Sequence, residues 1–135
     1  MLTEDEVNDA VASYLKGKWY SIISQAKGRS RGDDIQAQDA SGNKLRIEVK
    51  GEISSKAKAN GDPAFDTSAK QYYVALSIYR AMKYVSEGSK AGIALPSNDR
   101  YLGLIKNVLK SLVKLKLGIM VYYVDSDDKT VEEIP

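Results

Sequence analysis

The chain has 135 residues, of which 43% are hydrophobic, and this is typical of one globular domain, here expected to span residues 1–135. It contains no cysteine and no histidine, which excludes a disulfide framework and removes the usual ligands of zinc and the usual base of nucleophilic triads. The formal net charge is only +2, so any contact with nucleic acid must come from local clusters of Lys and Arg.

The N-terminal segment TEDE lacks the basic and apolar regions of a secretory signal, and no apolar run approaches the length of a membrane span. We therefore expect a soluble, cytoplasmic protein with no membrane partner. A helix is predicted over residues 4–16 from its periodic apolar positions. Thr3 is the expected N-cap, and Glu6 completes a capping box with it, which gives Glu6 a structural role.

A first strand is predicted over residues 19–25, followed by a glycine-containing loop with three cations, Lys27, Arg29 and Arg31. This loop is either an ordinary solvated connection or a phosphate-binding segment. Its position favours the second reading, because three cations beside an acidic site would offset the repulsion between that site and a polyanionic backbone.

Two apolar/polar alternating runs around the turn Ser41-Gly42-Asn43 predict a β-hairpin. If the apolar side chains share one buried face, Ile35 pairs with Ile47, and Ala37 pairs with Leu45. That register fixes which polar residues lie together on the opposite face of the hairpin.

On that opposite face the register places Asp34 across from Glu48, and Lys50 follows on the same side as Glu48. Two nearby carboxylates repel each other unless a cation lies between them. A hard divalent metal such as magnesium, or manganese, would satisfy this arrangement, and Lys50 could orient a metal-bound water or offset charge on a phosphate. The alternative is an ordinary solvated hairpin face.

The polar segment 54–63 is the nearest feature to a linker, and residues 54–64, with Lys56 and Lys58, are expected to form a second mobile contact loop. A long helix is then predicted from an N-cap at Asp66, Thr67 or Ser68 to about residue 85. Most of its tyrosines are expected to pack on the sheet, and stacking on nucleic-acid bases is the alternative use.

The remaining pattern predicts a buried strand over residues 91–96, a helix that begins at Ser97 or Asn98 and reaches residue 116, a strand over 119–124 and an edge strand over 130–134. Lys106, Lys110 and Lys114 recur every fourth residue and are interpreted as the solvated side of the last helix. The order α-β-β-β-α-β-α-β, with a final strand, predicts an α/β fold with a mixed central sheet flanked by helices.

The segments Gly32-Asp33-Asp34-Ile35 and Ile47-Glu48-Val49-Lys50-Gly51 resemble the PD-(D/E)xK nuclease superfamily, which includes restriction endonucleases and Holliday-junction resolvases. The resemblance implies a restriction-endonuclease-like core, with Asp34, Glu48 and the Val49 carbonyl as metal ligands and Lys50 as the catalytic amine. Where the superfamily often has Pro-Asp this chain has Asp33-Asp34; Asp34 is preferred because of its register.

The resemblance also offers Glu6 a second role as an additional metal ligand, and Gln71 a place on the helix that faces the site or the substrate. The activity it implies is that of a magnesium-dependent endonuclease on DNA, with Lys27, Arg29 and Arg31 contacting the backbone. Many small nucleases act as dimers, so a homodimer is a further expectation. The alternatives are a non-catalytic nucleic-acid-binding or assembly module, and a small α/β protein with an unrelated partner.

Overall fold

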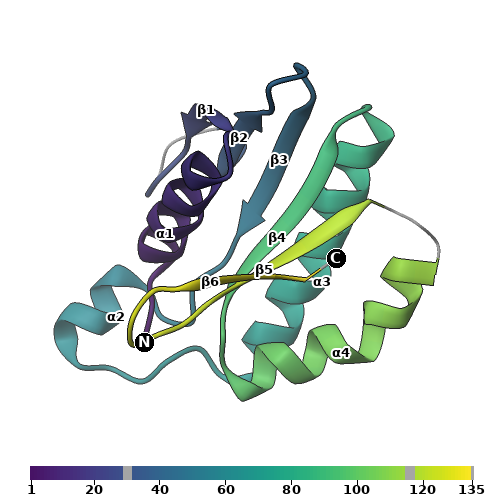
Figure 1. Ribbon diagram of the computed structural model, residues 1–135. Coiled ribbons are helices and arrows are strands. Elements are labelled where there is room, and N and C mark those ends of the chain that lie inside the picture. The colour runs from purple at the N-terminus through teal and green to yellow at the C-terminus, as the bar shows by residue number, and fades with distance from the viewer. Residues whose placement is uncertain (29–31, 115–117, 135) are drawn as a thin grey trace.

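The computed structural model describes residues 1–28, 32–114 and 118–134 and shows a central sheet covered by helices on both faces (Figure 1). The sheet has six strands in sequence order: β1 (Ser21–Gln25), β2 (Ile35–Gln38), β3 (Lys44–Val49), β4 (Lys90–Pro96), β5 (Ile119–Val124) and β6 (Val131–Ile134). The helices are α1 (Glu4–Gly17), α2 (Ser55–Asn60), α3 (Thr67–Ser86) and α4 (Asp99–Lys114).

Strand direction divides the sheet into an antiparallel and a parallel part. β1, β2 and β3 form an antiparallel meander, whereas β3, β4 and β5 are parallel, and β6 returns antiparallel to β5. The two parallel steps need crossovers, and these contain α3 and α4. The mixed α/β sheet predicted from the order of elements is confirmed.

Two apolar layers hold the helices against the sheet. On one face α1 packs its Val7, Val11 and Leu15 against the β2–β3 hairpin. On the other face α3 and α4 pack on β4 and β5 (Figure 1). β4 serves both layers, because Ile93 and Leu95 belong to the second cluster and Ala94 to the first, as alternation along a strand requires.

The predicted start of α1 is confirmed in detail. The Glu6 amide donates to Thr3 Oγ1 over 3.3 Å, and the Thr3 amide donates to Glu6 Oε2 over 2.9 Å. These reciprocal bonds form the capping box, which satisfies two amide groups that the helix leaves unpaired.

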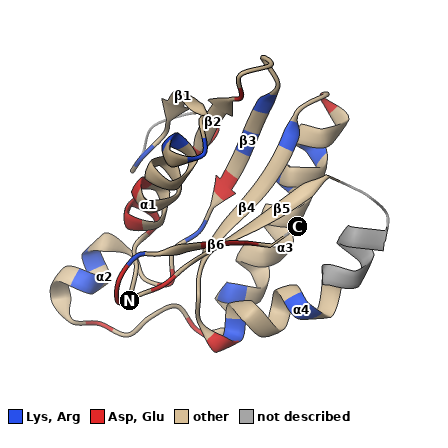
Figure 2. Cartoon of the chain, viewed as in Figure 1, with Lys and Arg blue, Asp and Glu red and all other residues tan. Residues whose placement is uncertain are grey.

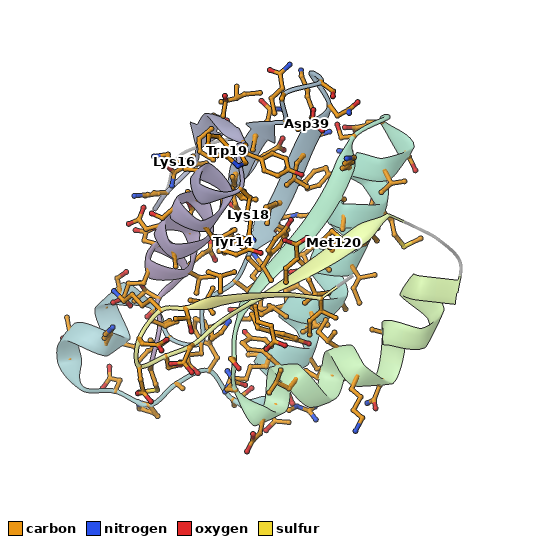
Figure 3. The ribbon with its side chains drawn as sticks, viewed as in Figure 1. Tyr14, Lys16, Lys18, Trp19, Asp39 and Met120 are labelled. Carbon is orange, nitrogen blue, oxygen red and sulfur yellow. The ribbon has the colours of Figure 1, made fainter. Side chains whose placement is uncertain are left out.

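The first strand was predicted too long, because residue 19 ends the helix instead of starting the strand. Trp19 has a left-handed backbone with φ of 69°, and its amide and the next one donate back to carbonyls at the end of α1. Its side chain is 88% exposed and lies beyond the C-terminal end of α1 (Figure 3). The strand therefore begins at Ser21.

The prediction of a second mobile loop after β3 was also wrong, because the segment contains the short helix α2. Ser54 caps it by accepting from the Ala57 amide over 3.1 Å, and Gly61 ends it in a left-handed conformation. Lys58 on this helix binds Glu6 and the Met1 carbonyl. In the part of the chain that the structure describes, no helix is both long and apolar enough to cross a membrane.

Candidate active site

The register of the β2–β3 hairpin is the one that the apolar alternation predicts. Ile35 pairs with Ile47 and Ala37 pairs with Leu45, and all four are buried on the α1 side. The polar side chains of the hairpin consequently project to the opposite face, towards α3. Acidic residues gather at the start of α1 and at the C-terminal end of β3 (Figure 2).

Asp34, Glu48 and Lys50 meet at that end of the hairpin. Asp34 Oδ2 accepts a hydrogen bond of 2.8 Å from the Val49 amide, which ties the start of β2 to the end of β3. Lys50 Nζ lies 3.0 Å from Glu48 Oε1. The N–H and C=O of one strand residue point to the same side, so the Val49 carbonyl also faces the Asp34 side.

Glu48 is enclosed by partners instead of by water. It is 2% exposed, and the Tyr84 hydroxyl donates to its Oε2 over 3.3 Å. Arg80 forms an ion pair with Oε1, the oxygen that Lys50 also binds. Because α3 supplies both Arg80 and Tyr84, the alternative of a solvated hairpin face does not describe this part of β3.

Asp34 has an unusual affinity for a proton. Burial and then the negative charge of Glu48 raise its pKa to about 7, against the smaller opposing effects of the Val49 amide and Lys50. Burial also raises the pKa of the Glu4 carboxyl, and Lys50 partly offsets that effect. The cluster therefore contains carboxyl groups that a nearby cation would help to ionise.

Lys50 lies between two carboxylates and beside an aromatic ring. Its side chain is 11% exposed, and its Nζ is 3.8 Å from Glu4 Oε2 as well as 3.0 Å from Glu48. The centre of the Tyr73 ring lies 6.0 Å from the same ammonium group. Such a buried amine with a limited opening to solvent suits a role in stabilising or moving charge.

The first helix brings Glu4 to this cluster, and it does not bring Glu6 there. Side chains two residues apart project about 200° apart around a helix, and Glu6 is engaged in the capping box and with Lys58. Gly51 makes the approach of Glu4 possible: an added Cβ would lie 2.7 Å from the Thr3 carbonyl carbon and closer still to the Glu4 amide. The sequence holds no local signal for Glu4, because this contact is tertiary.

The neighbouring carboxylate Asp33 is engaged elsewhere. Its Oδ2 and Oδ1 accept from Arg46 Nε at 2.6 Å and Arg46 Nη2 at 3.0 Å, a two-pronged ion pair. Arg46 in turn stacks over the Tyr84 ring, with 4.1 Å from its guanidinium carbon to the ring centre. The structure thus brings Asp34, and not Asp33, to Val49 and the Glu48 cluster.

The predicted substrate-binding residues lie outside this cluster or outside the described residues. Lys27 forms an ion pair with Asp9 on α1, although the Ala26 amide next to it donates to the Asp34 carbonyl. Gln71 is exposed and accepts from Arg100 over 3.5 Å. Arg29 and Arg31 lie outside the described residues.

The donor set of the cluster is entirely oxygen: the carboxylates of Asp34, Glu48 and Glu4, and the Val49 carbonyl. This chemistry fits magnesium or manganese, which prefer such ligands. Among the side chains that the structure describes, no three or more acidic ligands surround a common point. In this arrangement Lys50 and Arg80 are the cations that lie beside Glu48.

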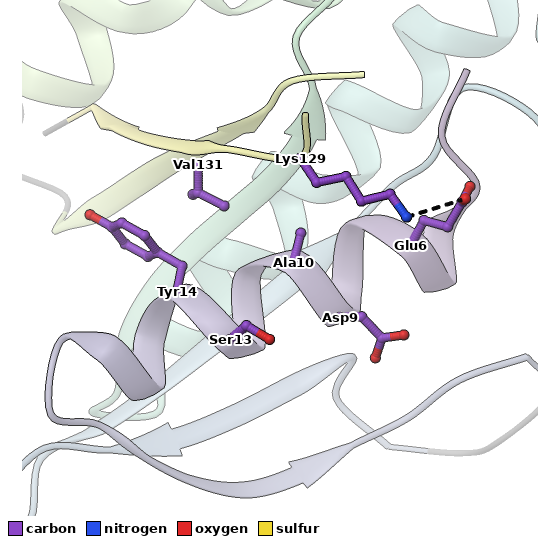
Figure 4. A pocket seen from close by; sticks show the side chains of 7 residues that line it. All are labelled: Glu6, Asp9, Ala10, Ser13, Tyr14, Lys129 and Val131. Carbon is purple, nitrogen blue, oxygen red and sulfur yellow. Dashed lines mark ion pairs between the residues drawn. The ribbon is translucent and has the colours of Figure 1, made fainter. Parts of the chain in front are cut away.

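Of two hollows on the surface, one adjoins this cluster and the other does not. One of about 220 Å³ adjoins it and is lined by Glu4, Gly51 and Phe65 among others. A larger one of about 550 Å³ lies between α1 and the β5–β6 region and is lined in part by Glu6, Tyr14 and Lys129 (Figure 4). The larger hollow contains no residue of the cluster, so we place the candidate site beside the smaller one.

The sequence matches no model of a known protein family, and it matches no curated protein.

Proposed function

We propose that the chain is a metal-dependent endonuclease that hydrolyses phosphodiester bonds of DNA. The observation that carries this proposal is the enclosed cluster of Asp34, Glu48 and Lys50, with 3.0 Å between Lys50 Nζ and Glu48 Oε1. Burying several charged groups is unfavourable, and groups of this kind cluster at functional sites. The resemblance to PD-(D/E)xK nucleases, including a restriction-endonuclease-like core around the mixed sheet, supports the same reaction.

Within this proposal Asp34, Glu48, Glu4 and the Val49 carbonyl hold a magnesium ion, with manganese as a substitute. When bound, the ion supplies a water of lowered pKa and positive charge at the phosphate. Lys50 holds an ammonium group where the attacked phosphate gathers negative charge. Arg80, half-exposed beside Glu48, is proposed to contact a phosphate oxygen.

Contacts with the rest of the DNA are assigned to the basic residues between β1 and β2. Lys27, Arg29 and Arg31 follow β1 and directly precede Asp34, so they are proposed to bind backbone phosphates without regard to sequence. A homodimer is also proposed, because it would place two such sites on two strands; measuring the mass of the protein in solution tests this.

The proposal is tested by incubating the protein with magnesium and duplex, single-stranded, flapped and four-way-junction DNA. We expect cleavage of at least one substrate, and a loss of about 100-fold or more in Lys50→Ala. The matched control is Lys90→Ala, because Lys90 starts β4 at the opposite end of the sheet and pairs with Asp39 over 3.7 Å. Equal cutting by wild type and Lys50→Ala would reveal a contaminating nuclease and refute the assignment.

One observation favours a second function, a non-catalytic nucleic-acid-binding module that retains this fold. Glu48 already has three partners, Lys50, Arg80 and Tyr84, and such a set can be a purely structural ion-pair network. This function predicts DNA binding that weakens with salt, needs no magnesium and leaves every substrate in the panel uncut.

A further inference from the structure

One flank of α3 combines exposed aromatic rings with cations. Tyr72, Leu76, Tyr79, Arg80 and Lys83 are spaced at i, i+4, i+7, i+8 and i+11, which places them on one side of the helix. We call these five residues the α3 flank. Tyr72 is 63% exposed and Tyr79 is 67% exposed, whereas Tyr84 on the same helix is buried. Tyr84 therefore packs on the sheet, whereas the rings of Tyr72 and Tyr79 do not.

The charged side chains that α3 itself contributes are all positive. Helix α3 contains Lys70, Arg80 and Lys83 and no Asp or Glu. Glu87, which follows the helix, forms an ion pair with Arg46 and lies 4.0 Å from Lys83. Exposed rings interleaved with cations are complementary to a chain that carries both flat apolar groups and negative charge.

The α3 flank is continuous with the candidate active site. Arg80 is bound to Glu48 inside the cluster. At the other end of the flank, the Tyr72 ring packs edge-on against Tyr73 with 5.8 Å between ring centres, and Tyr73 is the ring beside Lys50. A strand that follows the flank thus reaches the residues around the proposed reacting phosphate.

We propose that the α3 flank binds unpaired nucleotides of a single DNA strand, whose bases stack on Tyr72 and Tyr79 and whose phosphates meet Arg80 and Lys83. The two rings lie seven residues apart, about 10 Å along the helix axis, so they contact different nucleotides. A second copy of the chain is a poorer occupant, because pairing the flank with itself would bury Arg80 and Lys83 of both copies in one interface, where α3 supplies no carboxylate to offset them. This inference rests on the proposed function and names the substrate that the same site prefers.

The test is fluorescence anisotropy with a labelled oligothymidylate, in EDTA so that the strand stays intact. We expect Tyr72→Ala and Tyr79→Ala each to weaken binding about tenfold, because base–aromatic stacking is lost. Tyr72→Phe and Tyr79→Phe keep the ring and should bind within about twofold of wild type. Trp19→Ala is the matched control, because Trp19 is an exposed ring just after α1 (Figure 3), and α1 packs on the other face of the sheet.

Two comparisons decide the outcome. A strand of abasic sites has the same phosphates without bases, so equal affinity for both strands would overturn the stacking proposal. It would also be overturned if Tyr79→Ala made a dimer dissociate in sedimentation and left strand affinity unchanged, since the flank would then be a contact between copies.

The result is separable from that of the nuclease proposal. If the protein binds the single strand through its tyrosines but cleaves none of the DNA substrates in magnesium, the α3 flank is supported and the endonuclease proposal is rejected. The opposite result is also possible: magnesium-dependent cleavage that is lost in Lys50→Ala, with strand binding unchanged in Tyr72→Ala and Tyr79→Ala. That result supports the endonuclease proposal and rejects the α3 flank.

Discussion

The side chain of Asp34 determines how the metal-free protein responds to pH. Its pKa is raised to about 7, mainly by burial and by Glu48, whereas an aspartate in an unfolded chain titrates near 3.9. Between about pH 4 and pH 7 the folded state therefore keeps a proton that the unfolded state loses, and the free energy of unfolding falls as pH rises. Above about pH 7 both states have lost this proton, and the free energy of unfolding falls no further on account of Asp34.

We predict that Asp34→Asn removes this penalty. The variant should match wild type near pH 4 and be more stable above pH 7 by of order 2 kcal/mol, as measured by urea unfolding in EDTA. Asp33→Asn is the matched control and should be destabilised, because it breaks the ion pair with Arg46. If Asp34→Asn were the less stable protein at pH 8, the account of its environment would be wrong.

Arg80 has a different consequence, because it shares Glu48 Oε1 with Lys50. Arg80→Ala removes one partner of a buried carboxylate and should lower the stability of the metal-free protein by about 1–3 kcal/mol. It also removes a competitor for the oxygen that the proposed metal needs. Added magnesium should therefore raise the melting temperature of Arg80→Ala more than that of wild type.

Differential scanning fluorimetry across a magnesium titration measures this effect, with Lys83→Ala as the control. Lys83 is one turn from Arg80 on α3 and approaches Glu87 instead of Glu48, so its loss should leave the response to magnesium unchanged. An identical response in wild type and Arg80→Ala would contradict a metal site at Glu48.

At the scale of the elements, the start of α1 lies so close to Gly51, two residues after β3, that this contact tolerates no added volume. Gly51→Ala would place a Cβ against the backbone at Thr3 and Glu4, and backbone cannot move as a flexible side chain can. We predict a loss of about 3 kcal/mol in the free energy of unfolding, with weaker nuclease activity as Glu4 moves away. Chemical denaturation and the cleavage assay measure the two effects.

Gly103→Ala is the control for that substitution. Gly103 lies inside α4 with open space around its Cα, and alanine favours a helix by up to about 1 kcal/mol over glycine. The two variants should thus change stability in opposite directions. Equal, small changes in both would show that α1 does not approach Gly51 closely in solution.

The elements also show which parts of the site a sequence can reveal. The hairpin register was predictable because the alternation at Ile35, Ala37, Leu45 and Ile47 permits only one buried face. The contact of Arg80 with Glu48 could not be predicted, because the two lie 32 residues apart in the sequence and meet only when α3 packs across the sheet. Helix α2 had a signal, Ser54 before it and Gly61 after it, which the polar composition of the segment concealed.

At the scale of the whole molecule, the mixed sheet followed from the order of elements, because parallel strands require crossovers that cover the sheet. The tertiary contacts between separate loops could not be predicted from that order. Glu52 is the main example: it is buried, and it accepts from the Leu2 amide, Asn98 Nδ2 and Ser126 Oγ at 2.9, 2.9 and 3.1 Å. One carboxylate thereby joins the start of the chain, the start of α4 and the β5–β6 connection.

We predict that Glu52→Ala loosens all three segments together. It leaves buried donors without an acceptor, at about 1–3 kcal/mol for each group that water does not reach, so the melting temperature should fall by roughly 10 °C. Asp39→Ala is the matched control: Asp39 also accepts several hydrogen bonds, but all lie within the exposed β2–β3 turn. Hydrogen exchange should show lost protection at Leu2 and around Asn98 and Ser126 in Glu52→Ala, and at the turn alone in Asp39→Ala. Loss confined to one segment would mean that these loops are held independently.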